Sequence, residues 1–411
     1  YAKLKTQMSF HLTEIGYRGD ENVLESMAVS TQNRYDIDHF AETANNGILN
    51  DIWNAWYNGI YRCNDVLDHM TGAKIANYDK YRGECLFLRS WWYFNLYRVF
   101  GVVPITRTVV TPAAAKLIPR CTEEEMYTLL TEDLAEAARL LPPTPGPEKA
   151  RVANIAAYTL LAKVYLTFGK PAEAKTALEE AMKNTSYGLE STTKKVFDVG
   201  NKMNREIIFA LYYNKTNDNG HGYWYSANTD VLADINNPTP TFKAIYDSEK
   251  DNRLPLISSY TKIKDNLFAM TKWYDTYDAT YTTQVGNDFP HLRYADVVLM
   301  YAEALAESGG SLGDALEWLN KTRTRAGLDE LTTDEVKSLA EFRRELAAER
   351  GREFALEGHR WFDLVRLGLA VDYFREMGYS LDSHNLIFPI PQNQIEIVNN
   401  PSILWQNPGF N

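Results

Sequence analysis

The chain has 411 residues, of which 45% are hydrophobic and 24% charged, and its formal net charge is −11. This composition is typical of a folded globular protein with enough apolar residues for a large core. Because the chain is acidic and no basic cluster exceeds two adjacent residues, the sequence argues against nucleic acids and anionic membrane surfaces as partners.

Aromatic residues make up 13% of the chain. Tyr and Trp combine a flat apolar ring with a hydrogen-bonding group, so we expect some of these rings to lie on the surface and bind a ligand.

The three cysteines, Cys63, Cys85 and Cys121, are odd in number and lack metal-ligand spacing. We therefore expect no disulfide framework.

In chain order, the first predicted helix covers Leu4 to Ile15, and the polar segment 16–50 is predicted to be a loop. Asp51 is the predicted cap of a long helix with apolar residues at helical spacing. The aromatic run from Tyr81 to Phe100 is its predicted partner. Four tryptophans at helical spacing in this pair are predicted to be core residues: Trp53, Trp56, Trp91 and Trp92.

The next predicted helix begins with a capping box formed by Thr122 and Glu125. It ends before 142–147, where four prolines in six residues form a stiff connection. This connection is predicted to join helical hairpins within one domain.

A repeated helical pattern follows. Residues 158–181 match the spacing of a tetratricopeptide repeat, which is a pair of antiparallel helices. A looser copy lies at 298–319, and the helical pairs at 51–100 and 334–367 would supply two more units. The predicted fold is therefore dominated by α-helices, as a superhelix of about four tetratricopeptide-like pairs.

Residues 186–290 interrupt these repeats and are rich in Asn, Asp and aromatic residues, with β-like runs from Ile207 to Tyr212 and from Leu256 to Lys262. A long irregular excursion within a helical domain is typical of a functional lobe. We therefore predict one domain, 1–411, with four parts: N-terminal helical repeats (1–185, including the loop 16–50), an insertion lobe (186–290), C-terminal helical repeats (291–375) and an extended tail (376–411).

The segment 341–368 places a charge on an apolar helix face. Arg350 occupies the missing position in a row of apolar residues at helical spacing, Phe342, Leu346 and Phe354. Its guanidinium must be paired, and Glu353 is the first predicted partner because it lies within helical reach. Further charged residues at three- and four-residue spacings could also take part in the pairing: Glu349, Arg352, Glu357 and Arg360. Gly358 is predicted to end this helix, and a second helix is predicted from His359 to Leu367, before Gly368.

The same segment is rich in carboxylates and could be an acid/base site or a structural ion-pair network. Every carboxylate here has a cation at three- or four-residue spacing, and such neighbours lower the carboxyl pKa and leave no proton to donate. We interpret the cluster as a structural junction between two helices.

Two stretches carry a resemblance to a known family: ELAAERGREFALEGHRWFDLVRLG at 345–368 and NLIFPIPQNQIEIVNNPSILWQNPGFN at 385–411. They resemble the signature of the SusD/RagB family, and the resemblance extends to 51–68, 82–105 and 292–307, in the family's order. One position departs from the pattern. The family usually has Glu three residues after the PIP sequence, where this chain has Gln394.

The resemblance implies a function and a location. SusD-like proteins are surface nutrient-binding lipoproteins of Bacteroidetes outer membranes that capture a glycan and pass it to a SusC-like TonB-dependent transporter. They carry a lipid on a cysteine near the mature N-terminus. This chain begins at Tyr1 without that cysteine or a signal peptide, so we expect this leading segment to have been removed.

Rings in the insertion lobe are the first candidates for a glycan site, because sugar C–H faces stack on Tyr and Trp while amides and charged groups bind the hydroxyls. These candidates are Tyr223, Trp224, Tyr225, Asn228, Trp273, Tyr274 and Tyr277. The family places its glycan site between the insertion and the N-terminal loop, which adds Arg34, Tyr35, Asp36 and His39 as second candidates. For each ring, packing in the core of the lobe is the alternative.

Other functions are weaker alternatives. The same transport role could serve peptides, since some relatives are associated with peptide uptake. An all-helical glycoside hydrolase would need a pair of acids at a cleft, and only Asp275, Asp278 and Asp288 could be nominated. We expect no cofactor and no catalytic or metal site, although the oxygen-rich segment 214–222 leaves bound calcium as a minor alternative.

Overall fold

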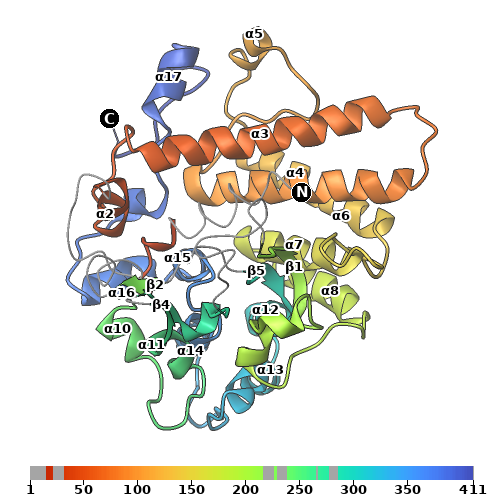
Figure 1. Cartoon of the computed structure of the whole chain (residues 1–411). Helices are drawn as coiled ribbons and strands as arrows, with labels where there is room; N and C mark the ends of the chain where they lie inside the picture. Colours follow the sequence, from red (N-terminus) through yellow and green to blue (C-terminus); the bar gives the residue numbers. More distant parts are fainter. Residues whose placement is uncertain are drawn as a thin grey trace.

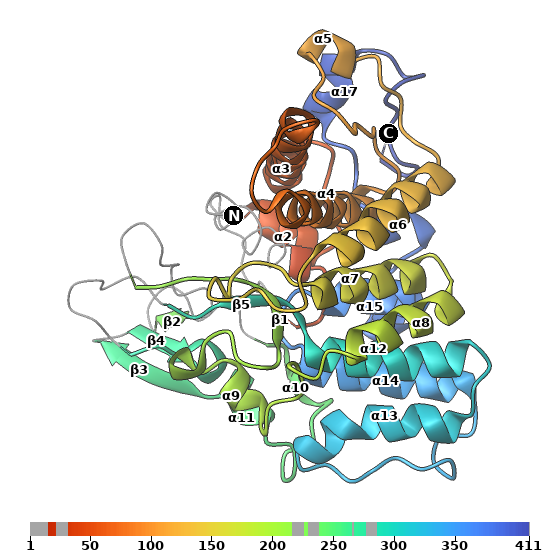
Figure 2. The same cartoon turned by 90° about the vertical axis from the view of Figure 1, so that its right-hand side faces the viewer.

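The long helices form one continuous stack, from α3 at the top of Figure 2 to α13 at the bottom. The computed structural model describes residues 15–21, 32–215, 226–228, 238–264, 267–276 and 286–410. Each helix of the stack packs on the next, in the order α3 (Gly47–Met70), α4 (Tyr78–Phe100), α6 (Glu123–Leu140), α7 (Asn154–Thr167), α8 (Pro171–Met182), α12 (Tyr294–Glu307), α13 (Leu312–Arg325) and α14 (Leu339–Glu353). The prediction of a helix-dominated fold is confirmed.

The insertion lobe lies between α8 and α12 in sequence but not in space. Helix α8 packs directly on α12, so the helical frame is continuous across the interruption. The pairs α7–α8 and α12–α13, which were predicted as repeat units, each turn at a glycine in the left-handed region, Gly169 (φ +67°) and Gly309 (φ +83°). These two turns allow the paired helices to pack as antiparallel neighbours.

Shorter helices complete the helical part. They are α2 (Gln32–Asp38), α5 (Pro112–Ala115), α9 (Thr193–Val196), α10 (Pro240–Lys243), α11 (Leu254–Ser258), α15 (Arg360–Arg366), α16 (Ala370–Glu376) and α17 (Gln392–Val398). Figure 1 shows α5 and α17 projecting above α3, on the side away from the insertion lobe. None of the helices within the described ranges is long and apolar enough to cross a bilayer.

The start of the helical frame differs from the prediction. Helix α3 begins at Gly47 and not at Asp51, because the Asn46 side chain accepts hydrogen bonds from the backbone N–H groups of Ile48 and Leu49. The segment 16–50, predicted as a loop, contains α2. By contrast, the capping box of Thr122 and Glu125 at the start of α6 is confirmed.

The core between α3 and α4 is aromatic, as predicted. Trp53, Trp56, Trp91 and Trp92 are all buried. Gly59 of α3 faces this cluster, and a Cβ at this position would overlap the Trp92 indole. The two helices can therefore approach closely only because residue 59 has no side chain.

Two small antiparallel sheets form the strand part of the insertion lobe, which projects to one side of the stack in Figure 2. One pairs β1 (Ile207–Leu211) with β5 (Phe289–Arg293), and in the other β4 (Leu267–Met270) lies between β2 (Ser226–Asn228) and β3 (Tyr260–Lys264). The prediction of a strand at Ile207–Tyr212 is confirmed. The predicted strand at Leu256–Lys262 is corrected: Pro255 lies in the first turn of α11, and the strand begins only at Tyr260.

The C-terminal tail crosses the helical frame but is not extended throughout, because α17 lies within it. Its Phe388 donates a backbone hydrogen bond to the carbonyl of Val99 at the end of α4, at 2.8 Å. The Asn407 amide donates to the carbonyls of Phe100 (2.9 Å) and Phe388 (2.7 Å) and accepts from Arg120. The tail therefore fastens the end of α4 and brings α17 beside α3.

Candidate functional site

A stacked pair of rings lies on α2. The centroids of the Tyr35 and His39 rings are 3.8 Å apart and their planes differ by 16°. The helix sets this geometry, because residues four apart lie on one face, and His39 Nδ1 is 3.0 Å from the Tyr35 carbonyl oxygen. The His39 side chain is 34% exposed. The structure thus presents two of the second-choice candidates as one aromatic pair that reaches solvent.

The two remaining candidates of this group lie on the same short helix. Asp36 is half-buried and accepts a hydrogen bond from Gln32 Nε2 at 2.5 Å, and Arg34 is also half-buried. All four residues belong to α2 and its C-terminal end, where the sequence predicted a loop. The structure therefore brings Arg34, Tyr35, Asp36 and His39 together.

Neutral amides lie at the contacts of α2 with α3 and of α3 with α17. Figure 1 shows α2 and α17 on either side of the N-terminal end of α3. Side-chain amides link the three helices: Asn33 accepts from Gly47 N (3.2 Å), Asn393 donates to Asn50 (2.7 Å), and Gln394 donates to Asn54 (3.3 Å). We use the name α2 face for Arg34, Tyr35, Asp36 and His39 of α2 and its C-terminal end, taken together with the amides of Asn33, Asn50, Asn54, Asn393 and Gln394 at these helix contacts.

The amides of the α2 face were not predicted as site residues. Asn50 and Asn54 are one helical turn apart in α3, and that spacing is a signal that a sequence can carry. Asn393 and Gln394 come from the tail, far away in sequence, so only the folded chain shows that they join the same surface. The Gln394 side chain is neutral and adds no charge at this contact.

The two first-choice candidates of the insertion lobe whose side chains are described, Trp273 and Tyr274, are not exposed rings. Trp273 is buried, with its ring stacked on Phe289 (centroids 5.4 Å apart, planes 6° apart) and met by the edge of Phe197 at 5.1 Å. The prediction of a sugar platform at Trp273 is therefore corrected, because protein rings cover it and it belongs to the core of the lobe. Tyr274 is half-buried, and its carbonyl accepts a hydrogen bond from Asn287.

The other lobe candidates lie in strand β2 or outside the described residues. Asn228 is in β2, where only the backbone is described. Tyr223, Trp224, Tyr225 and Tyr277 lie outside the described residues, as does most of the segment 214–222 considered for calcium. Across the described part of the chain, no cluster of three or more His, Cys, Asp or Glu side chains has the arrangement of a metal site.

Arg350 is paired, but not with the predicted residue. Its Nε donates to Asp363 at 2.7 Å and its Nη2 to Asp296 at 2.9 Å, and the side chain is fully buried. Glu353 binds Arg293 (2.6 Å) and Arg253 (3.0 Å), which both come from the chain outside α14. The predicted Arg350–Glu353 pair is wrong, since long-range partners satisfy both groups.

Helix α14 also ends earlier than predicted. It stops at Glu353, and a turn separates it from Gly358, whose φ of +76° does occupy the left-handed region. The second predicted helix is confirmed as α15, and Gly368 follows it with φ +71°.

The buried carboxylates of α14 remain ionised. Burial opposes ionisation of Glu349, but the Arg253 and Arg352 guanidinium groups beside it hold its pKa below the usual range. The pKa of Glu353 is likewise lowered, because Arg325, Arg293 and Arg253 outweigh its burial. Neither carboxyl carries a proton to donate near neutral pH, and both are inaccessible to a substrate, so this network is structural.

The acids considered for a hydrolase are also held by cations. Asp275 is buried, lies 3.1 Å from Lys215 Nζ and accepts from Gly286 N at 2.8 Å. Asp288 lies 3.0 Å from Lys202 Nζ, and its burial raises its pKa. Asp278 lies outside the described residues. Each of the two described acids therefore forms a pair with a lysine.

A groove that the sequence did not indicate lies on the outer side of α3. It has a volume of about 820 Å³ and is lined by Trp53, Tyr57 and Tyr61 of α3, by the segment 104–118 and by α17. Tyr61 is 50% exposed. The groove adjoins the α2 face, because Asn54 and Gln394 line its end.

Comparisons with known proteins agree on one family. Residues 252–410 match the family model described as "SusD family", and residues 7–166 match the model described as "Starch-binding associating with outer membrane". The "SusD-like protein P2" of Formosa agariphila is 26% identical over 92% of this chain and 84% of its own length. The "Starch-binding protein SusD" of Bacteroides thetaiotaomicron is 33% identical over 34% of this chain and 26% of its own length.

Solved structures show the same fold. A SusD superfamily protein from Bacteroides vulgatus has a TM-score of 0.80 at 22% identity, covering 97% of this chain and 93% of its own. A laminarin-binding SusD-like protein has a TM-score of 0.79 at 24% identity, with coverage of 97% and 94%. Surface glycan-binding protein A from Bacteroides thetaiotaomicron, in complex with laminarihexaose, has a TM-score of 0.77 at 22% identity, with coverage of 97% and 93%. The two family models, the SusD-like relatives and the shared fold together support the chain as a member of the SusD/RagB family.

Proposed function

We propose that this protein is a non-catalytic, surface-exposed glycan-binding protein of the outer membrane, which captures oligo- or polysaccharide and delivers it to a SusC-like TonB-dependent transporter. The match of residues 7–166 to a family model described as starch-binding and associating with the outer membrane carries this proposal. The names of the relatives support the ligand class, since one is a starch-binding protein and two solved neighbours bind laminarin or hold laminarihexaose.

The α2 face has the chemistry that a neutral sugar needs. The Tyr35–His39 pair offers an aromatic surface for the C–H face of a sugar ring, and the amides at the contact of α3 with α17 offer both donors and acceptors to hydroxyl groups. Rings of the lobe outside the described residues, Tyr223, Trp224, Tyr225 and Tyr277, stay candidates for glycan binding. We expect affinities in the micromolar to millimolar range (about −8 to −4 kcal/mol), which allow capture followed by release.

The proposal that the protein is not catalytic rests on the surroundings of its described carboxylates. Glu353 of α14 and the lobe acids Asp275 and Asp288 are ion-paired and buried, so none is placed as the general acid of a glycosidase. A protein of this kind would bind a polysaccharide without shortening it.

Delivery requires a partner and an anchor. Because transporters of the SusC type lie in the outer membrane, the protein would stay at the cell surface through a lipid on a segment that precedes Tyr1. The rigid helical stack would then dock on the transporter while the α2 face holds the cargo.

The experiment that tests this function is a depletion assay. The purified protein is mixed with insoluble starch, with laminarin in affinity electrophoresis, and with a pool of peptides, and reducing ends are assayed in parallel. Binding to at least one glycan without new reducing ends supports the proposal. New reducing ends would show a hydrolase, and retention of peptides with no glycan bound would show that the cargo is peptide.

A further inference from the structure

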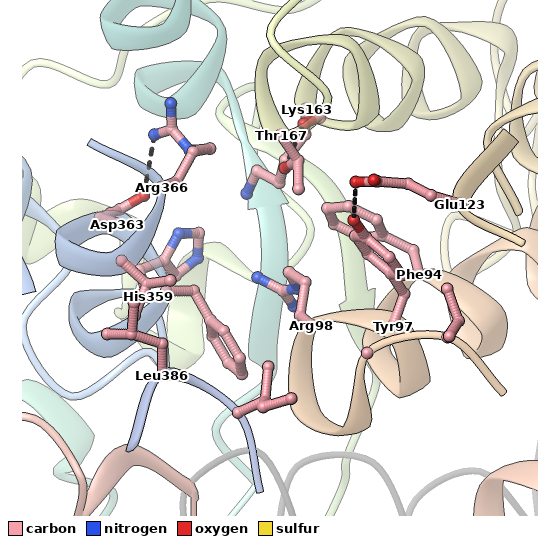
Figure 3. A pocket seen from close by; sticks show the side chains of 15 residues that line it. Phe94, Tyr97, Arg98, Glu123, Lys163, Thr167, His359, Asp363, Arg366 and Leu386 are labelled. Carbon is pink, nitrogen blue, oxygen red and sulfur yellow. Dashed lines mark hydrogen bonds and ion pairs between the residues drawn. The ribbon is translucent and has the colours of Figure 1, made fainter. Parts of the chain in front are cut away.

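A cavity of about 410 Å³ lies where α4, α7 and α15 meet (Figure 3). This volume falls in the range of about 300–1,000 Å³ that is typical of small-molecule sites. Its wall combines rings and cations: Phe94, Arg98, Lys163, His359, Phe362 and Arg366. None of the lining residues belongs to the α2 face, so the cavity is a separate feature of the helical frame.

Most charges around the cavity are already balanced. Three cations and three carboxylates form one network behind its wall: Lys163, Arg350, Arg366, Asp296, Asp363 and Glu303. Arg350 bridges Asp296 and Asp363, while Lys163 contacts Asp296. Arg366 contacts Asp363 (3.1 Å) and Glu303. The network as a whole is neutral and needs no further anion.

Arg98 is the cation left outside this network. Within the described ranges, no carboxylate oxygen lies within 4.0 Å of its guanidinium, which donates instead to the neutral Asn95 side chain. Its buried Nε has no hydrogen-bond partner. Figure 3 shows the guanidinium pointing into the cavity, on the side opposite Arg366 and near Lys163. One hydrogen-bond donor of the Arg98 side chain is therefore unused within the protein.

Two rings hold this guanidinium in place. Arg98 Cζ lies 4.0 Å from the centroid of Phe362 and 4.7 Å from that of Phe94. Ring faces stabilise a guanidinium but leave its in-plane N–H groups free to donate. The side chain is thus oriented in advance and keeps its hydrogen-bonding edge toward the cavity.

Arg98 is half-buried, and the carboxylates whose charges favour its ionised form, Asp363 and Asp296, are not within ion-pair distance of it. Burial lowers the pKa of Arg98 to about 9, and burial also lowers the pKa of Lys163 to about 8, although Asp296 opposes the shift at Lys163. His359 adds no charge, because burial lowers its pKa well below the ordinary value. An anion in the cavity would supply the missing partner of Arg98.

We propose that this cavity binds a small carboxylate-bearing molecule of the size of a sugar acid, with the carboxylate accepting hydrogen bonds from Arg98. A planar carboxylate matches the fork of a guanidinium. The body of the ligand would lie against Phe94 and Phe362, and the Tyr97 hydroxyl, which is bonded to Glu123 at 2.7 Å, lies at the rim to meet its polar groups. This inference goes beyond glycan capture at the α2 face and does not depend on it.

The test is isothermal titration of the purified protein with glucuronate, glucose and inorganic phosphate. We expect glucuronate to bind, glucose to bind at least tenfold more weakly, and phosphate to bind more weakly than glucuronate. Equal affinity for glucuronate and glucose would overturn the proposal, because the carboxylate would then contribute nothing. Equal affinity for glucuronate and phosphate would overturn the assignment to carboxylates.

Two variants locate the site. Arg98→Gln should reduce glucuronate affinity at least tenfold while leaving the Tm of the unliganded protein unchanged or higher, since it removes an unpaired, half-buried charge. Arg139→Gln, which alters a surface pair with Glu136, is the matched control and should bind as the wild type does. If Arg98→Gln does not fold, Arg98→Lys replaces it, and wild-type affinity in this variant would contradict the proposed guanidinium–carboxylate contact.

Discussion

Glu21 shows how burial sets the charge of a single residue. Its side chain is 1% exposed, and burial, together with the negative charge of Asp20, raises its pKa to about 8. The folded pKa is thus higher than the value of about 4.3 that is usual for an unfolded Glu. The stability that the protonated form gives the fold is fully present below about pH 4 and is lost as the pH rises through 8.

Glu21→Gln should therefore change stability in a pH-dependent way. At pH 9 the variant should have a higher free energy of unfolding than the wild type, by about 5 kcal/mol, because Gln avoids the cost of ionising a buried carboxyl. At pH 4.5 the two proteins should differ little. Urea unfolding at both pH values measures this, with the exposed Glu124→Gln as control. An equal difference at the two pH values would show that Glu21 does not titrate as described.

At the scale of the element, the contact between α3 and α4 depends on Gly59. A methyl group at this position would overlap Trp92, whose ring fills the space between the helices. Gly59→Ala should lower the free energy of unfolding by about 1–3 kcal/mol through overpacking, despite the higher helix propensity of Ala.

A second helical glycine provides the control for this prediction. In Gly313→Ala, the nearest atom to the new Cβ would be Ser311 Oγ at 3.6 Å, an ordinary contact. This variant should be as stable as the wild type or more stable by up to about 1 kcal/mol. Equal effects of the two substitutions in thermal unfolding would contradict the packing argument.

Sequence periodicity predicted the elements better than their ends and partners. The aromatic core of α3 and α4, the capping box at Thr122 and strand β1 follow from local patterns, and they are found as expected. The start of α3 was missed because Asn46, rather than Asp51, provides the cap.

Long-range contacts explain the other differences. Arg350 binds Asp296 and Asp363 instead of its neighbour Glu353, because α12 and α15 pack against α14 only in the folded chain. The sequence suggested a surface ring at Trp273, but in the folded chain the rings of Phe197 and Phe289 cover it. In the α2 face, aromatic residues could be nominated from the sequence, whereas the amides of α17 could not.

At the scale of the whole molecule, buried ion pairs fasten the insertion lobe to the helical frame. Glu353 of α14 pairs with Arg253 beside α11 and with Arg293 at the end of β5, and Glu349 also pairs with Arg253. Because these guanidinium groups lower the folded pKa of both carboxyls, the stability that they contribute is present above about pH 4.3 and is lost as the pH falls below it.

We therefore expect the Tm of the wild type to fall steeply between about pH 5 and pH 3. Glu353→Gln already lacks one of these charges, so its Tm should be lower at pH 7 but should fall less over the same interval. Circular dichroism melts at pH 7, 5, 4 and 3 provide the measurement. Parallel pH profiles for the two proteins would show that Glu353 is not a source of acid lability.

The central claim is that the helical frame carries a glycan site at the α2 face. Its most direct test is to titrate a glycan that the wild type binds into variants that lack one ring of the Tyr35–His39 pair. Tyr35→Ala and His39→Ala should each weaken binding at least tenfold, which is about 1.4 kcal/mol, while the melting temperature stays near that of the wild type. Tyr61→Ala, which removes an exposed ring of the α3 groove, should bind as the wild type does. Unchanged affinity in both α2 variants, or a loss only in Tyr61→Ala, would contradict the account.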